Sequence, residues 1–201
     1  MSYLKVSDLS FYYDQEKVLD KINFEIQAGE FVILTGENGA AKSTLVKNIL
    51  GLLKPSTGKI ELAKKNIHGD KLTIGYIAQN INSFNAGFPS TVQRFVESGR
   101  YVKHRWFKRL DAYDQAHVDR ALESVGMTQF RHKKIGELSG GQKQRINLAR
   151  TFATDPDFFI LDEPTTGMDI ASRRSFYQLL RHSSQEHDKA ILMVTHADRE
   201  I

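Results

Sequence analysis

The first residues able to do chemistry form a glycine-containing loop between an apolar run and a helical pattern. The loop reads GENGAAKS over residues 36–43; the apolar run Phe31–Thr35 precedes it, and a helix is expected over about Lys42–Leu53. Backbone N–H groups at a helix N-terminus can surround phosphate oxygens, Lys42 can neutralise the β and γ phosphates of a nucleotide, and the Ser43 hydroxyl can bind Mg²⁺. The residues expected to hold the nucleotide are Gly36, Asn38, Gly39, Ala40, Ala41, Lys42, Ser43 and Thr44.

Ala41 departs from the usual form of this loop, in which glycine stands directly before the lysine. Alanine keeps its backbone N–H, so the loop can still bind an anion if the residue adopts a negative φ. At a positive φ the methyl group would cost about 1 kcal/mol. We expect a negative φ at Ala41.

Two carboxylates, Asp162 and Glu163, follow the apolar run Phe158–Leu161. Ligands of α/β sheets gather at the C-terminal ends of the strands. Asp162 can therefore hold Mg²⁺ through water, while Glu163 polarises an attacking water. The alternative is that these acids only begin a turn before Pro164.

A second helix start with phosphate-binding character lies between the loop and the carboxylates, in the sequence LSGGQ over residues 138–142. Ser139 and the N–H groups of a Gly-Gly helix start can form an anion site. With this pentapeptide the chain resembles an ATP-binding cassette (ABC) ATPase. The pentapeptide is the signature of that family. The resemblance implies a head-to-tail dimer in which ATP bound by one subunit contacts the signature of the other through Ser139, Gly140, Gly141 and Gln142, and also contacts Asp169 of that other subunit, in a separate segment that crosses to its partner.

The same resemblance assigns further positions. Tyr13 takes the adenine-stacking place with Val18 behind it, and Tyr12 is its rival. Gln79 matches the glutamine that binds Mg²⁺ and senses the attacking water. His196 matches the histidine that contacts the γ-phosphate, so the implied catalytic residues are Glu163, His196, Gln79 and Lys42, with Mg²⁺ held by Ser43, Gln79 and Asp162.

The elements that must position these residues alternate between strands and helices. Strands are expected at Tyr3–Val6, Val18–Ile26, Leu72–Ala78 and Ala190–Thr195, besides the two apolar runs above, and a helix at Ser172–Glu186. The pattern is helical from Thr91 to about Thr154, with Asp111 or Asp114 as a cap. This predicts an α/β fold with a mostly parallel P-loop NTPase core, an N-terminal antiparallel β-subdomain and an inserted helical subdomain. We expect one domain over 1–201, with 1–79 and 155–201 as the core and about 80–154 as the helical part.

Composition limits the class of protein. The chain has 201 residues, 40% of them hydrophobic, no cysteine, and a net charge of +4. Its longest apolar runs are far shorter than the roughly 20 residues of a membrane span. Residues 100–109 (RYVKHRWFKR) hold five basic residues and no acid, so the rest of the chain has a charge of −1. We expect this basic segment to contact acidic lipid headgroups or a separate membrane-embedded partner subunit, or to be an ordinary solvated loop; nucleic acid is not the expected partner.

Architecture separates the classes within the family. The repair ATPases of the family carry long heptad coils between the phosphate loop and the signature, and this chain has none there. Translation factors of the family carry two cassettes per chain, and this chain has one. The segment SFNAGFPSTV over 83–92 resembles the zinc and manganese importers, and the Gly-Ala-Ala-Lys loop resembles that of streptococcal-type zinc uptake ATPases. The resemblance implies an ATP-hydrolysing importer subunit for a divalent metal, with zinc favoured; manganese, another cargo, or a regulatory cassette that only binds ATP are the alternatives.

The importer reading also implies partners. These are a second copy of the chain, an integral membrane permease and, indirectly, a substrate-binding protein, so the expected location is the cytoplasmic face of the membrane. Because the family usually continues past the histidine at position 196, we expect 201 residues to be a shortened cassette.

Overall fold

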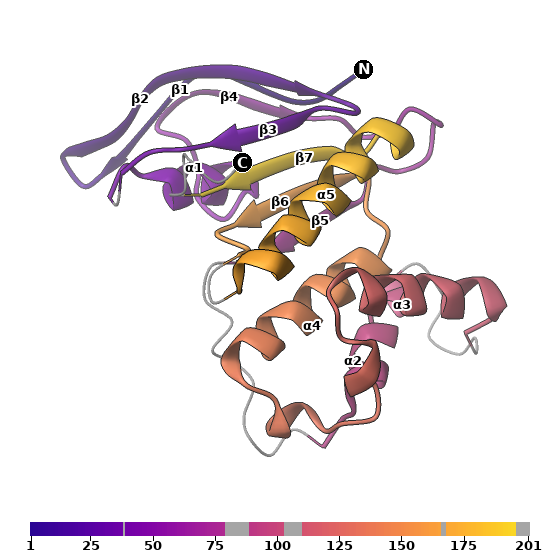
Figure 1. Ribbon diagram of the computed structural model, residues 1–201. Coiled ribbons are helices and arrows are strands. Elements are labelled where there is room, and N and C mark those ends of the chain that lie inside the picture. Colours follow the sequence, from indigo (N-terminus) through magenta and orange to yellow (C-terminus); the bar gives the residue numbers. More distant parts are fainter. Residues whose placement is uncertain (38, 79–88, 103–109, 166–167, 196–201) are drawn as a thin grey trace. The chain divides into compact units, whose positions relative to one another are not determined.

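The computed structural model describes residues 1–201 except 38, 79–88, 103–109, 166–167 and 196–201, and except the side chain of Ser172. The chain forms two compact units, which are drawn in Figure 1. The first unit comprises 1–74, 157–163 and 181–201, and the second comprises 75–156 and 164–180. Each unit is described by itself below.

The first unit begins with an antiparallel sheet of β1 (Ser2–Tyr13), β2 (Glu16–Gln27) and β4 (Thr57–Leu62), in the order β2-β1-β4. A two-residue connection joins β1 to β2. The predicted strand at Tyr3–Val6 is confirmed but continues to Tyr13. Strand β4 was not predicted, because its sequence opens with turn-forming residues. Gly58 makes the strand possible, since a Cβ there would lie 2.3 Å from the Asp8 carbonyl oxygen.

The other strands of this unit are parallel, with β3 (Phe31–Leu34), β7 (Ala190–Val194) and β6 (Phe158–Asp162) in that order. Every residue of β6 and β7 is buried, as their apolar sequences predict. Strand β3 is only half-buried, so the expectation of burial on both faces was too strong; it stands at the end of the strand order. Helix α1 (Lys42–Ile49) follows β3 and is shorter than predicted.

The second unit is mainly helical, as the periodicity after Thr91 predicts. It contains β5 (Ile74–Ile77) from Gly75 onward and three helices, α2 (Val92–Glu97), α3 (Ala112–Ser124) and α4 (Gly140–Ala153). Helices α2 and α3 pack on each other and on α4. Short 3₁₀ turns occur at Arg100–Val102, Thr128–Phe130 and Ile135–Glu137. Helix α5 (Ile170–His187) starts in this unit and ends in the first.

A buried ion pair fixes the start of α3. Asp111 caps the helix and forms a capping box with Asp114, whose Oδ1 accepts hydrogen bonds from Arg100 at 2.8 Å. Arg100 also donates to the Ala153 carbonyl at 2.9 Å, at the end of α4. Its side chain is 3% exposed. The prediction that Arg100 belongs to an exposed basic segment is therefore wrong; residues 103–109 of that segment lie outside the described residues.

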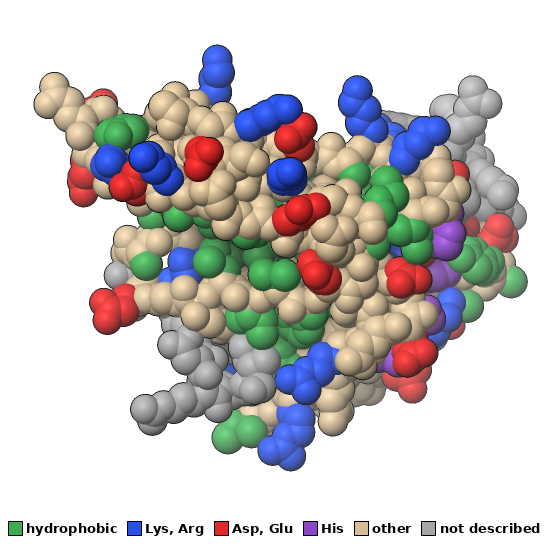
Figure 2. All heavy atoms as spheres, turned by 90° about the horizontal axis from the view of Figure 1, so that it is seen from above, with side chains coloured by type: hydrophobic (Ala, Val, Ile, Leu, Met, Phe, Trp, Pro, Cys, Tyr) green, Lys and Arg blue, Asp and Glu red, His purple; other side chains and the backbone are tan. Residues whose placement is uncertain are grey.

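Surface charge is mixed. On the face shown in Figure 2, basic and acidic side chains are interspersed. Two exposed ion pairs belong to the antiparallel sheet, Lys17 with Asp20 at 3.3 Å and Lys59 with Glu61 at 2.7 Å. Among the described residues, no helix is long and apolar enough to cross a membrane.

Candidate functional site

The loop between β3 and α1 encloses its own lysine. Lys42 is the first residue of α1 and only 7% exposed. Its ammonium group donates hydrogen bonds to the carbonyl oxygens of Gly36 at 2.7 Å and Glu37 at 2.8 Å. A buried cation at a helix N-terminus is well placed for an anion, because backbone N–H groups and the helix dipole favour negative charge there. Thr44, the third residue of α1, is half-buried.

Ala41 has φ 56° and ψ 19°, so the prediction of a negative φ is wrong. Ala41 is the N-cap of α1, and its carbonyl accepts the first helical hydrogen bond from Leu45 at 3.0 Å. The chain enters the helix through a left-handed residue, which costs an alanine roughly 1–2 kcal/mol. This explains why glycine is the usual residue at this position of the loop.

Asp162 lies at the end of β6 and meets Ser43 from α1. The Ser43 hydroxyl donates to Asp162 Oδ2 at 3.0 Å. The other carboxylate oxygen, Oδ1, is buried without a hydrogen-bond partner among the described residues. Burial raises the pKa of Asp162, and the charge of Glu163 raises it further, while Ser43 and Lys42 act in the opposite direction. A buried carboxylate with an unused oxygen is an environment that a cation would stabilise.

Glu163 leaves the strand in a left-handed conformation with φ 50°. Its N–H donates to the Val194 carbonyl of β7 at 3.0 Å, so the turn is tied to the neighbouring strand. Such backbone strain in a non-glycine residue is often found at functional sites. Ala41 and Glu163 are thus strained residues next to Lys42 and Asp162 in sequence.

The sheet geometry favours Tyr13 over Tyr12 for a ligand of this loop. Tyr13 packs edge-on against Phe11, with ring centroids 4.9 Å apart, and Phe11 pairs across the sheet with Leu19. Leu19 lines a cavity of about 310 Å³ whose wall includes Ala40, Ala41 and Lys42. The Tyr12 ring is instead approached by the ammonium group of Lys17, which lies 5.9 Å from the ring centroid. Tyr13 is 45% exposed and accessible for stacking.

The signature helix start is open in the second unit. Ser139 caps α4 and forms a capping box with Gln142: the Ser139 hydroxyl accepts from the Gln142 N–H at 3.3 Å, and the Gln142 amide oxygen accepts from the Ser139 N–H at 3.0 Å. A Cβ added to Gly140 would meet nothing within 4 Å. Gly141 is half-buried and Ser139 exposed, so a ligand can approach this backbone closely.

The structure therefore brings Lys42, Ser43, Asp162 and Glu163 together in the first unit, and Ser139, Gly140, Gln142 and Asp169 belong to the second unit. Three predicted site residues, Asn38, Gln79 and His196, lie outside the described residues. Val18 is half-buried where the register of the β1–β2 pair shifts. One residue of interest escaped the sequence analysis: Arg145, which is ion-paired with Asp169.

Comparisons with known proteins agree with this arrangement. The family described as "ABC transporter" matches residues 19–166. The chain belongs to the ABC transporter family. It is accordingly an ATP-binding cassette ATPase, as predicted. Over its whole length it is 58% identical to the zinc transport system ATP-binding protein AdcC of Streptococcus pneumoniae, covering 86% of that protein.

Two further relatives extend the comparison. The chain is 51% identical over its whole length to the high-affinity zinc uptake system ATP-binding protein ZnuC of Bacillus subtilis, covering 87% of it. The dimeric structure of MJ0796, an ABC transporter cassette, superposes with a TM-score of 0.77 at 26% identity and covers 96% of this chain and 88% of that one. The predicted ABC ATPase fold is confirmed.

The positive φ at position 41 makes a testable prediction. Replacing Ala41 by glycine relieves the left-handed strain, and this relief offsets the extra entropy that glycine gives the unfolded chain. The free energy of unfolding should therefore stay equal or rise by up to about 1 kcal/mol. Ala40 has no positive φ. Ala40→Gly relieves no strain and only adds entropy to the unfolded chain, so it should lower the free energy of unfolding by about 0.5–1 kcal/mol. Urea unfolding measures both, and equal losses would contradict the conformation.

The raised pKa of Asp162 makes a second prediction. A carboxyl group whose pKa is raised on folding binds its proton more tightly in the folded state. Its contribution to stability therefore falls as the pH rises above 3.8, the ordinary pKa of an aspartate side chain. Without nucleotide or Mg²⁺, Asp162→Asn should be more stable than the parent at pH 7, and the difference should shrink as the pH falls. Thermal unfolding across pH measures this. Asp20→Asn, at an exposed ion pair, is the control and should show no such gain; a loss in Asp162→Asn that is independent of pH would refute the assignment.

Proposed function

We propose that the chain is the ATP-hydrolysing subunit of an importer that takes up zinc through a separate membrane subunit. The identities of 58% and 51% to ATP-binding proteins of zinc transport and zinc uptake systems support the cargo. The observation that carries the chemistry is the hydrogen bond from the Ser43 hydroxyl to the buried Asp162 carboxylate. The buried Lys42 is the residue directly before Ser43. The test below distinguishes zinc from other cargos, such as manganese.

Mg²⁺ fits this site. Asp162 offers a buried oxygen that has no hydrogen-bond partner among the described residues, and Ser43 offers a hydroxyl at the same place. Oxygen ligands of this kind suit Mg²⁺, which is usually held by one or two carboxylates together with phosphates. We propose that Ser43 and Asp162 hold the ion, with Gln79 as a further ligand. When bound, Mg²⁺ neutralises phosphate charge.

The chain's own groups then act on the nucleotide. Lys42 exchanges its two carbonyl partners for the β and γ phosphate oxygens, and the loop N–H groups bind the remaining charge. Glu163, turned out of β6 by its left-handed backbone, orients the attacking water and accepts its proton. His196 contacts the γ-phosphate in this proposal. Tyr13 stacks on the adenine.

A second copy completes the site. The open helix start at Ser139 and Gly140 provides an anion site separate in sequence from the loop, and one chain has both. We propose a head-to-tail dimer in which this helix start binds the γ-phosphate of the ATP held by the partner subunit. The dimeric MJ0796 cassette supports this assembly. The dimer would bind the permease at the cytoplasmic face of the membrane, and a substrate-binding protein would deliver the ion.

The test uses Glu163→Gln. The variant should bind ATP and, with ATP, form a dimer by light scattering, because the phosphate-binding groups remain. Its phosphate release should fall by about 10²–10⁴-fold, since it cannot accept the proton of water. In cells that carry it in place of the parent, zinc uptake should be lost and manganese uptake unchanged.

Glu61→Gln, on the exposed edge of β4, is the matched control and should retain both activities. Unchanged turnover in Glu163→Gln would refute the role of this residue. Loss of manganese uptake with normal zinc uptake would refute the cargo, and ATP binding without hydrolysis by the parent protein would favour a regulatory cassette.

A further inference from the structure

Two histidine side chains meet at the C-terminal end of α5. The ring centroids of His182 and His187 lie 5.3 Å apart, with the ring planes at 87°. Five positions along a regular helix correspond to a rotation of about 140°, so the sequence spacing does not predict this contact. Both side chains are exposed, and both belong to the first unit. The two imidazoles therefore lean toward each other across the helix end while they remain open to solvent.

The separation of the rings is close to that of two imidazoles bound to one metal ion. A tetrahedral zinc ion lies about 2.0–2.1 Å from each ligand nitrogen, which places the centroids of two imidazole ligands about 5 Å apart. The observed 5.3 Å needs only a small adjustment. Aromatic rings in simple edge-to-face contact cover the same range of separations. The surroundings of the pair therefore decide between the two interpretations.

The end of a helix favours a cation. The last carbonyl groups of α5 lack partners within the helix and carry a partial negative charge. His187 is the last residue of α5, and the acidic residues Glu186 and Asp188 flank it. Arg181 and Lys189 are the nearest basic residues in the sequence. Because these four side-chain charges cancel, the helix end supplies the net attraction for a cation.

Hydrogen bonds hold this helix end in one conformation. The Lys189 N–H donates to the Ser183 carbonyl at 3.2 Å, and Asp188 has a left-handed backbone with φ 51°. The buried Ser184 hydroxyl donates to the Gly29 carbonyl at 2.6 Å, and the Gly29 N–H donates to the Asp188 carbonyl at 3.0 Å. The end of α5 is thus attached to the turn before β3 (Figure 1). A metal ion would have to order two side chains but would not have to reorganise the backbone.

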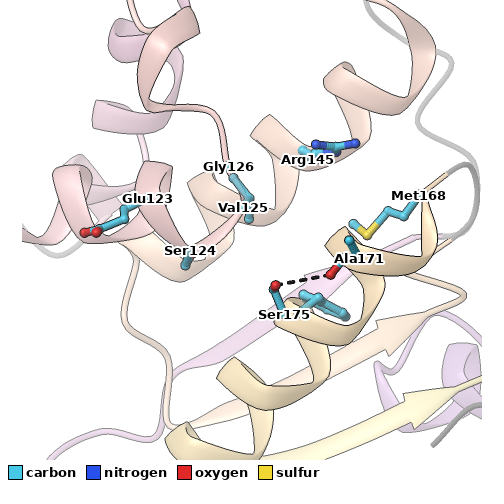
Figure 3. A pocket seen from close by; sticks show the side chains of 9 residues that line it. Glu123, Ser124, Val125, Gly126, Arg145, Met168, Ala171 and Ser175 are labelled. Atoms are coloured by element: carbon cyan, nitrogen blue, oxygen red, sulfur yellow. Dashed lines mark hydrogen bonds between the residues drawn. The ribbon is translucent and has the colours of Figure 1, made fainter.

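Other places in the structure offer different ligands. Asp162 and Ser43 provide oxygen atoms, which suit Mg²⁺. No histidine lines the cavity of about 250 Å³ in the second unit, and Figure 3 shows a cation, Arg145, beside it. Within the described residues, no group of three or more histidine, cysteine, aspartate and glutamate side chains could hold a metal ion. The pair on α5 would therefore supply two ligands, and water would complete the coordination.

We propose that His182 and His187 together bind one divalent transition-metal ion of the zinc, copper and nickel type. Neutral imidazole nitrogens suit these ions, whereas Mg²⁺ and Ca²⁺ prefer oxygen ligands. The site is separate from that of ATP. Strands β6 and β7 are parallel, α5 ends just before the first residue of β7, and Asp162 is the last residue of β6. The metal site and the proposed nucleotide site thus lie at opposite edges of this sheet, and the inference does not rest on the proposed function.

The test is a zinc titration of the full chain without a histidine tag, with millimolar Mg²⁺ present so that oxygen-ligand sites are filled. A fluorescent zinc chelator competes for the ion and reports the affinity. His182→Ala and His187→Ala should each weaken the strongest zinc site at least about tenfold, because loss of a group that only orients a ligand already costs 10–100-fold. Zinc should raise the unfolding temperature of the parent, and the rise should be smaller in both variants.

His132→Ala is the matched control, because His132 is an exposed histidine of the second unit. It should bind zinc like the parent. Without zinc, all three variants should unfold at the parent's temperature, since the replaced side chains are exposed. In NMR spectra, the imidazole signals of His182 and His187 should shift together as zinc is added. Equal zinc affinity in the parent and in a variant with both α5 histidines replaced, or an equal loss in His132→Ala and His182→Ala, would overturn the inference.

Discussion

The hydrogen bond from the Ser43 hydroxyl to the Asp162 carboxylate is the interaction on which the rest of the site depends. It joins the first turn of α1 to the end of β6, 119 residues further along the chain. A carboxylate buried at this place is unfavourable by itself, and burial raises its pKa. Lys42 and the Ser43 hydroxyl offset part of that cost. A bound cation would offset the remainder, so binding a ligand here should stabilise the fold.

Backbone strain accompanies this electrostatic cost. Ala41 and Glu163 both have left-handed backbones, one leading into α1 and one leaving β6. Each conformation is held by bonds to regular structure, to Leu45 in the helix and to Val194 in the neighbouring strand. The well-packed β6 and β7 provide the support that such strain requires. Stability given up at the start of α1 and at the end of β6 thus accompanies the placement of Lys42 and Glu163.

The sequence was most informative where function needs a short linear pattern. The loop of residues 36–43, the carboxylates after β6 and the helix start at Ser139 could all be predicted, because each combines residue types with a neighbouring strand or helix. The apolar runs of β6 and β7 likewise indicate buried parallel strands. Those features are local in sequence.

What could not be predicted depends on partners far away in the chain. Strand β4 exists because β1 pairs with it, about 50 residues earlier, and Gly58 allows the close approach. Arg100 looks like part of a basic surface until Asp114 and the Ala153 carbonyl bury it. The φ of Ala41 follows from how the loop closes between β3 and α1. Arg145 resembles any solvated helix residue unless its contact with Asp169 is known.

Direct titration of the purified chain with ATP tests the central claim, that the loop and Asp162 form one nucleotide site. Binding can be followed by fluorescence with Mg²⁺ present, and again with Mg²⁺ removed by a chelator. The structure predicts saturable binding that Mg²⁺ strengthens in the parent, lost in Lys42→Ala, and insensitive to Mg²⁺ in Asp162→Asn. No binding to the parent at millimolar ATP and Mg²⁺ would contradict the account.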